Sequence, residues 1–306
     1  MNTLQHIPVL KDTILRYFAN THGILLDATF GGGGHTAALL NQDPHLQVVA
    51  LDIDPEAAQR AKAVQAQFPQ RFQFFAYNFS ELDQLKMNFD GILMDLGVSS
   101  FQLDQAERGF SFRNAGPLDM RMNPNVGISA KTFLENASQE ELTVAIRDYG
   151  EEKQWKSIVK AILSYRNEIV WENTVAFADF LLKHTTLSRS KKPGIHPATR
   201  VFQGIRIYVN QELEHLKRGL VKAFNCLNPQ GQLAVITFHS LEDRIVKQFF
   251  NEKCGKSLNK FDAEPRQFKQ ITATLATRKP IIADSEEVRL NPRSRSAKLR
   301  IIQKIS

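Results

Sequence analysis

The chain has 306 residues, 42% of them hydrophobic and 23% charged, so it is long enough to bury one large core together with an insertion or a second domain. Its two cysteines, Cys226 and Cys254, match neither a disulfide framework nor a paired metal motif, so we predict a reducing compartment and no structural zinc. Because it shows no signal-like leader and no apolar run of about 18 residues, we expect a cytoplasmic protein without a membrane partner.

The excess of positive charge lies in the C-terminal part of the chain. The formal net charge is +7, and residues 1–240 hold 24 basic and 24 acidic side chains, whereas residues 241–306 hold 15 and 8. A basic segment suits a polyanionic partner, because lysine and arginine that bind phosphates release counterions. A solvated basic surface fits the same charge count equally well.

Apolar runs alternate with helix-forming segments over the first hundred residues. The expected strands are 25–28, 48–52, 72–77 and 91–96, and the expected helices begin at Thr36, Pro55 and Ser80. This alternation predicts the α/β class, with a mostly parallel sheet and right-handed crossovers. Three of the strands end in an acidic residue, namely Asp27, Asp52 and Asp95. Ligands of parallel sheets bind at the edge where such residues lie.

The pattern changes after about Gln102. Residues 108–127 are rich in glycine, proline, asparagine and arginine and predict an irregular loop. Helices are expected to follow, with a capping box at 138–141 and further helices over 151–166 and 174–184. We interpret this part as a helical insertion that ends in a linker over 191–194.

The sheet pattern resumes after the linker. A long amphipathic helix is expected over 199–227, followed by strands at 233–238, 271–276 and 299–305. Residues 1–102 are predicted to form the first part of the sheet domain, and residues 103–195 a mostly helical insertion. Residues 196–306 are predicted to form the second part of the sheet domain, with the basic segment.

A glycine-rich turn joins the first strand to the first helix. Four glycines, 31–34, follow Asp27, and such glycines admit positive φ and let a ligand approach the amides at a helix N-terminus. A dinucleotide fingerprint would need a third glycine where Thr36 stands, and a P-loop would need a glycine-lysine pair. Asp52 is placed to accept both hydroxyls of a ribose. We therefore predict S-adenosylmethionine as the cofactor, against the alternative of a turn that binds nothing.

Further candidates follow other strands. Asp95 lies nearest the expected reaction centre, and a carboxylate there suits a nucleophile that loses a proton, although it can equally hold the cofactor. Phe79 is placed to stack on adenine or to pack in the core, and His239 to face substrate or to serve a structural role. Four basic residues near the C-terminus can either contact phosphates or simply be solvated at the surface, namely Arg293, Arg295, Lys298 and Arg300.

Long motifs of this chain resemble those of the ribosomal RNA small subunit methyltransferase H family, in the same order and over nearly the whole chain. They are His6–Leu10, Asp27–His35, Asp95–Ser100, Arg108–Phe112, Gly116–Met122, His196–Arg200, Phe238–Arg244 and Asn291–Arg300. The resemblance implies a Rossmann-like class I methyltransferase with an inserted helical domain that recognises substrate. Phe101 stands where some members have proline.

The same resemblance implies an activity and a set of site residues. The activity is methylation of N4 of a cytidine, conventionally numbered 1402, in the decoding region of 16S ribosomal RNA within the small ribosomal subunit, with S-adenosylmethionine as cofactor. The implied cofactor-binding residues are Gly33, Gly34, His35, Asp52, Phe79, Asp95 and Gln102, without a metal. The resemblance assigns no general base, so a catalytic role for Asp95 is our own inference.

Two other functions stay open at this point. One is methylation of DNA or of a small molecule, the latter disfavoured by the basic C-terminal segment. The other is a ribosome-assembly factor that binds the nucleoside only to order its fold. Attack at a ring carbon is disfavoured, because it needs a covalent thiolate and the sequence has no Pro-Cys motif. The oligomeric state, monomer or homodimer, is left open.

Overall fold

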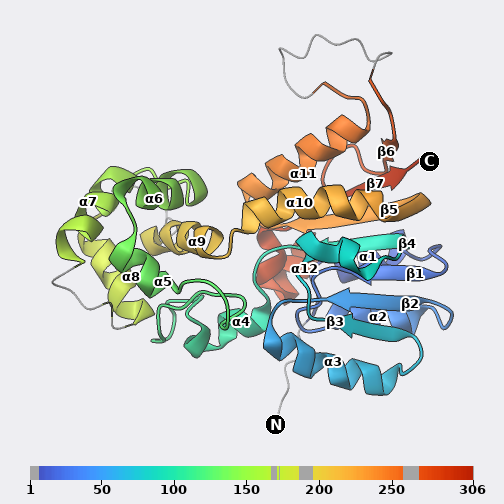
Figure 1. Ribbon diagram of the computed structural model, residues 1–306, viewed down its shortest axis with the longest axis horizontal. Helices are drawn as coiled ribbons and strands as arrows, with labels where there is room; N and C mark the ends of the chain where they lie inside the picture. The colour runs from blue at the N-terminus through green and yellow to red at the C-terminus, as the bar shows by residue number, and fades with distance from the viewer. Residues whose placement is uncertain (1–6, 167–170, 172, 186–195, 258–268, 306) are drawn as a thin grey trace. The chain divides into compact units, whose positions relative to one another are not determined.

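The computed structural model describes residues 7–166, 171, 173–185, 196–257 and 269–305 (Figure 1). The chain forms two compact units. The first, here called the sheet unit, comprises Met1–Gly97 and Leu213–Ser306, and the second, the inserted unit, comprises Val98–Glu212. In the part of the chain that the structure describes, no helix combines the length and the apolar character that crossing a membrane requires.

The sheet unit is built on a seven-stranded sheet, counted over the described residues. In spatial order its strands are β3 (Phe72–Phe75), β2 (Gln47–Leu51), β1 (Ile24–Asp27), β4 (Phe89–Asp95), β5 (Leu227–Thr237), β7 (Lys298–Lys304) and β6 (Ala273–Leu275). The first five are parallel, whereas β7 pairs antiparallel with both β5 and β6. This confirms the predicted Rossmann-like α/β fold, and the strand order reverses between β1 and β4, where ligands of such folds bind.

Helices cover both faces of this sheet, which explains why its strands read as continuous apolar runs. Alternate residues face opposite cores, so that Leu25 lies in one and Leu26 in the other. One core includes residues of α1 (Lys11–Tyr17), α2 (Gly34–Gln42) and α3 (Pro55–Gln67). The other includes residues of the 3-10 helix η1 (Phe79–Leu85), α10 (Glu212–Asn225) and α11 (Ser240–Lys253).

Residues 7–10 are hydrogen-bonded to residues 287–291 within the sheet unit. The backbone N–H of Leu10, at the start of α1, donates to Glu287 Oε1 at 2.6 Å, and Asn291 Nδ2 donates to the Ile7 carbonyl at 3.0 Å. Glu287 belongs to α12 (Ser285–Leu290), and Asn291 caps the 3-10 helix η5 (Pro292–Ser296). The first and last motifs found in the sequence are thus joined by hydrogen bonds, although His6 lies outside the described residues.

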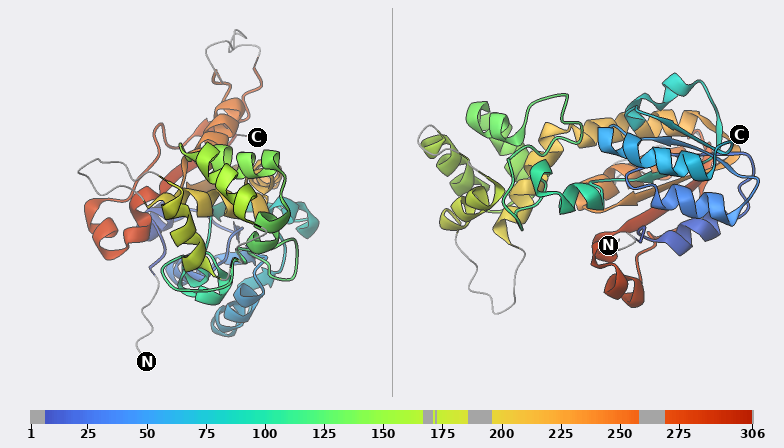
Figure 2. Two further views of the ribbon diagram at one scale, coloured as in Figure 1. Left: turned by 90° about the vertical axis from the view of Figure 1, so that its left-hand side faces the viewer. Right: turned by 90° about the horizontal axis from the view of Figure 1, so that it is seen from below.

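In its described residues the inserted unit consists of helices and an irregular loop (Figure 2). It has its own core. Its elements are α4 (Ser100–Asp104), η2 (Ala106–Arg108), α5 (Ala130–Asn136), α6 (Gln139–Thr143), the π-helical η3 (Val144–Tyr149), α7 (Trp155–Tyr165), α8 (Thr174–Lys183) and α9 (Pro197–Val209). The capping box predicted at 138–141 is present, with Ser138 as its first residue. In the irregular loop, the buried Arg108 donates to the carbonyls of Arg121 and Met122 at 3.2 and 2.8 Å.

The compact inserted unit reaches Glu212, whereas the predicted insertion ends at 195. The helix expected over 199–227 is two helices. Gln211 has a φ of 50°, which interrupts the helix between α9 and α10. The Asn210 amide accepts from the Met122 backbone N–H and donates to the Met120 carbonyl, both at 2.7 Å, and so fixes the end of α9. The linker predicted at 191–194 lies outside the described residues.

Candidate functional site

The glycine turn after β1 needs its glycines for internal reasons. Gly33, which precedes α2, has a φ of 75°, and a Cβ there would lie 2.5 Å from the Phe30 ring. A Cβ on Gly34 would lie 2.6 Å from Pro8 Cγ. These contacts bring the backbone close to its neighbours at the first turn of α2, where amides without intrahelical acceptors can bind a ligand. Cofactor contact by Gly33 and Gly34 stays a prediction.

Asp52 connects the glycine turn to the end of β2. Its Oδ2 accepts from the Gly31 backbone N–H at 2.7 Å, and its Oδ1 accepts from the Asp54 backbone N–H at 2.9 Å. Each carboxylate oxygen has a second lone pair, so two ribose hydroxyls can still be accepted. Burial raises the pKa of Asp52 to about 6, against the opposing effect of the two backbone hydrogen bonds.

The ends of β1 and β4 are joined through Thr29. The Asp95 backbone N–H donates to Thr29 Oγ1 at 2.6 Å, and the Thr29 backbone N–H donates to Asp27 Oδ1 at 3.2 Å. Asp27 is 2% exposed, and its Oδ2 accepts from Thr36 Oγ1 at 2.7 Å. Burial raises the pKa of Asp27, and the nearby charge of Asp95 adds to that increase.

His35 and Asp95 form the part of the site with unused hydrogen-bonding groups. His35 Nε2 lies 3.6 Å from Asp95 Oδ2, and the two side chains are 8% and 24% exposed. Among the described residues, both ring nitrogens of His35 and the other carboxylate oxygen, Asp95 Oδ1, are buried without a hydrogen-bond partner. Buried polar atoms nearly always have partners, so unsatisfied ones beside the glycine turn fit a site that receives a polar ligand.

Phe79 contacts α10. It is half-buried at the start of η1, and a Cβ on Gly219 would lie 2.5 Å from its ring. Packing against the second core of the sheet unit therefore explains why part of the Phe79 ring is buried. Stacking on adenine stays a prediction for the rest of it.

Gln102 has a structural role within the inserted unit. It forms a capping box with Ser99 at the start of α4: the Gln102 backbone N–H donates to Ser99 Oγ at 3.2 Å, and Gln102 Oε1 accepts from the Ser99 backbone N–H at 2.9 Å. The side chain is buried. The predicted cofactor contact by Gln102 is untested.

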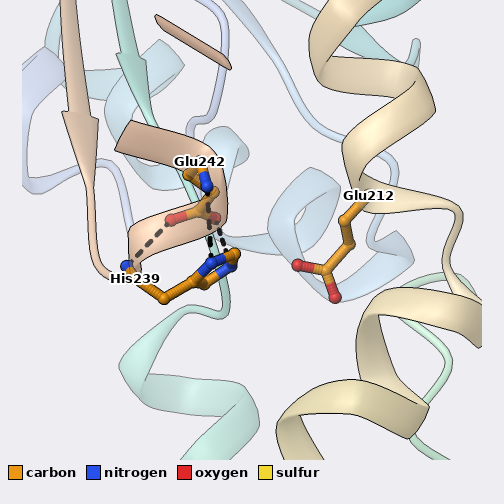
Figure 3. Close-up of side chains that lie close together, drawn as sticks. All are labelled: Glu212, His239 and Glu242. Atoms are coloured by element: carbon orange, nitrogen blue, oxygen red, sulfur yellow. Dashed lines mark hydrogen bonds and ion pairs between the residues drawn. The ribbon is translucent and has the colours of Figure 1, made fainter. Parts of the chain in front are cut away.

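His239 is a helix cap rather than an open substrate contact (Figure 3). Glu242 Oε2 accepts from the backbone N–H groups of Phe238 and His239 at 2.8 and 3.3 Å, and His239 Nε2 lies 3.2 Å from Glu242 Oε1. The structure thus favours the structural role of His239. Glu242 was not predicted as the partner of His239, although a glutamate three residues after the cap is the usual signature of a capping box.

Two of the four basic candidates are paired inside the protein. Arg300 Nε and Nη2 donate to the two oxygens of Asp243 at 2.7 and 3.2 Å, and Lys298 Nζ lies 3.5 Å from the same carboxylate. Burial would raise the pKa of Asp243, but the hydrogen bonds and charges of Arg300 and Lys298 together outweigh burial and lower it. Phosphate contact by Arg300 or Lys298 would have to compete with this pairing, whereas Arg295 is exposed.

Known proteins are similar to this chain over nearly its whole length. The model of the MraW methylase family matches residues 3–305. The chain is 43% identical to the ribosomal RNA small subunit methyltransferase H of Ehrlichia canis, over 98% of this chain and 100% of the relative, and 44% identical to that of Methylobacterium nodulans, over 96% and 89%. An rRNA methylase structure from Streptococcus thermophilus aligns with 97% of this chain and 95% of its own, at 10% identity and a TM-score of 0.41.

Proposed function

The chain belongs to the MraW methylase family, and on this premise we propose that it methylates N4 of a cytidine in the decoding region of 16S ribosomal RNA, the one conventionally numbered 1402. Its relatives carry a name that specifies methylation of small-subunit ribosomal RNA. The observation that carries the proposal at the atomic level is the buried, unpartnered Asp95 Oδ1 at the end of β4.

S-adenosylmethionine is the methyl donor, and when bound it supplies an electrophilic methyl group on a sulfonium. The residues of the sheet unit fit it. Asp52 keeps one lone pair on each oxygen for the ribose hydroxyls. The helix α2 begins at Gly34, so the amides of its first turn lie beside His35, whose ring nitrogens have no hydrogen-bond partner among the described residues. We assign the Phe79 ring to stacking on the adenine.

Asp95 is assigned to the amine that is methylated. The N4 lone pair of cytosine is conjugated with the ring, and an acceptor for the N4 proton helps localise that lone pair on nitrogen. Asp95 Oδ1 is a buried acceptor without a partner among the described residues, and the hydrogen bond from the Asp95 backbone N–H to Thr29 fixes its backbone. Most of the rate should then come from holding the amine in line with the methyl group.

The cysteines support attack by an exocyclic amine rather than by a ring carbon. Cys254 is buried, and burial raises the pKa of the Cys226 thiol above its usual range. Neither thiol is thus poised as the thiolate nucleophile that ring-carbon methylation needs. The cytidine itself would have to leave its stack to reach Asp95, as for other enzymes that modify a base. We assign substrate recognition to the inserted unit.

The deciding assay transfers labelled methyl groups to small ribosomal subunits that lack the modification, followed by nucleoside analysis. We expect the label in N4-methylcytidine, and Asp95→Asn should lose most of the rate. Label in a uridine, or on a cytosine ring carbon, would refute the assignment. The assembly-factor alternative predicts instead that Asp52→Ala abolishes cofactor binding while the effect on subunit assembly persists.

A further inference from the structure

We infer that the His35 side chain is a positioning residue that acts through Asp95. Its Nε2–H holds Asp95 Oδ2, so that the second oxygen, Oδ1, is presented to the amine. This inference rests on the proposed function and deepens it, because it gives the imidazole a task separate from any contact that the His35 backbone makes with the cofactor.

The two oxygens of Asp95 have different surroundings. Oδ2 lies 3.6 Å from His35 Nε2, whereas Oδ1 is buried with no hydrogen-bond partner among the described residues. A separation of 3.6 Å is longer than a hydrogen bond. Catalytic hydrogen bonds are often long in ligand-free structures and shorten in the reacting complex. The pair therefore has the geometry of an orienting contact that closes when the site is filled.

Among the described residues, Asp95 supplies the carboxylate that lies within 4 Å of a ring nitrogen of His35. Both ring nitrogens lack a hydrogen bond to any described residue, and the ring is buried at the first turn of α2. The nearby carboxylate of Asp27 already accepts from Thr36 Oγ1 and from the Thr29 backbone N–H. A histidine that only filled space in the core would leave two buried nitrogens unsatisfied without a gain, and such groups call for an explanation.

The chemistry needs one oxygen of Asp95 to be held. As N4 forms its bond to the methyl carbon, the carbon–sulfur bond breaks with its electron pair on sulfur, and the N4 proton passes to Asp95 Oδ1. His35 keeps its Nε2–H throughout and accepts no proton. A carboxylate free to rotate would present either oxygen at a changing angle, and misplacement of a reacting group by about 1 Å can cost roughly a hundredfold in rate.

Two isosteric substitutions test which ring nitrogen matters. In His35→Gln an amide nitrogen reaches the region of Nε2, whereas in His35→Asn it reaches only the region of Nδ1. We expect both variants to bind S-adenosylmethionine within about threefold of the wild type and to keep the KM for the subunit. The glutamine variant should keep kcat within about tenfold, whereas the asparagine variant should lose roughly a hundredfold. Circular dichroism and melting temperature of both variants serve as the folding control.

Two further measurements separate positioning from structure. In a double-mutant cycle, His35→Asn should have no further effect on kcat once Asp95→Asn is present. In protein whose histidines carry a nitrogen isotope label, NMR should show the Nε2–H tautomer for His35. The His35 signal is assigned by its loss in His35→Gln, and it should shift in Asp95→Asn.

Equal kcat values for the two His35 variants, independent effects in the cycle, or an NMR signal insensitive to Asp95→Asn would each overturn the inference. The proposed function fails differently, because the wild type would then form no N4-methylcytidine. The NMR comparison still tests the pair in that case.

Discussion

Replacing Asp52 with asparagine is expected to weaken cofactor binding about a hundredfold and to remove a pH-dependent part of the folding free energy. The substitution exchanges a charged acceptor of two ribose hydroxyls for a neutral acceptor of one. Hydrogen bonds to charged groups contribute about 1.5 to 3 kcal/mol each, so a loss of about 3 kcal/mol corresponds to roughly a hundredfold in Kd.

The stability effect follows from the pKa of Asp52, which burial raises from 3.8 to about 6. A carboxyl whose pKa is higher in the folded than in the unfolded state stabilises the protein fully below pH 3.8. That contribution is lost as the pH rises through about 6. Between pH 5 and pH 7.5 the wild type should therefore lose about 1.4 kcal/mol of unfolding free energy relative to Asp52→Asn, in which this group does not titrate.

Both effects are measured on matched proteins. Urea unfolding of wild type and Asp52→Asn at the two pH values gives the difference in unfolding free energy, because the other titrating groups cancel. Calorimetric titration with S-adenosylmethionine gives Kd. In the wild type, affinity should also fall about tenfold at pH 5, where about one molecule in ten keeps Asp52 ionised. A difference in unfolding free energy that is the same at both pH values would refute the reasoning on Asp52, as would equal affinity of the two proteins.

Three more substitutions have matched controls. Gly33→Ala should lower the unfolding free energy by more than Gly127→Ala; both glycines have a positive φ, but a Cβ at Gly127 meets nothing within 4 Å. If thermal unfolding shows equal losses of unfolding free energy for the two variants, the strain of the positive-φ backbone alone explains the effect, without the contact at Phe30. Arg300→Ala should destabilise the protein by about 1 to 3 kcal/mol, because it removes the two shorter contacts of the Asp243 carboxylate and leaves that of Lys298 at 3.5 Å, whereas Arg295→Ala should change only the salt dependence of RNA binding. The reverse pattern would count against the pairing. His239→Ala should cost about 1 kcal/mol and His239→Asn less, since asparagine also caps helices, and an asparagine variant as unstable as alanine would contradict the capping role.

The sequence predicts the sheet and the acidic residues at its edge because both depend on local pattern. Asp27 and Asp95 end strands β1 and β4, and Asp52 directly follows β2, as alternation of apolar and helical segments indicates. The break of the long helix at Gln211 was missed, because its amphipathic pattern continues across a single residue of positive φ. Such a break depends on contacts of Asn210 with a loop about 90 residues away, which no local pattern contains.

The site shows the same division between local and distant information. The glycine turn was predictable, but its glycines have packing reasons of their own at Phe30 and Pro8. A glycine motif alone therefore cannot separate a cofactor loop from a tight turn. The unpartnered atoms of His35 and Asp95 carry that distinction, and they become visible only when the ends of two strands lie side by side.

The basic C-terminal segment also acquires a role that charge counting did not suggest. Asn291 holds the backbone at Ile7, and Glu287 holds Leu10, so that Pro8 between them is kept against Gly34 at the start of α2. A glycine is needed at Gly34 because this proline is there. The last motif of the chain therefore supports the turn assigned to the cofactor through the first motif, and part of its sequence requirement is mechanical rather than a matter of phosphate binding.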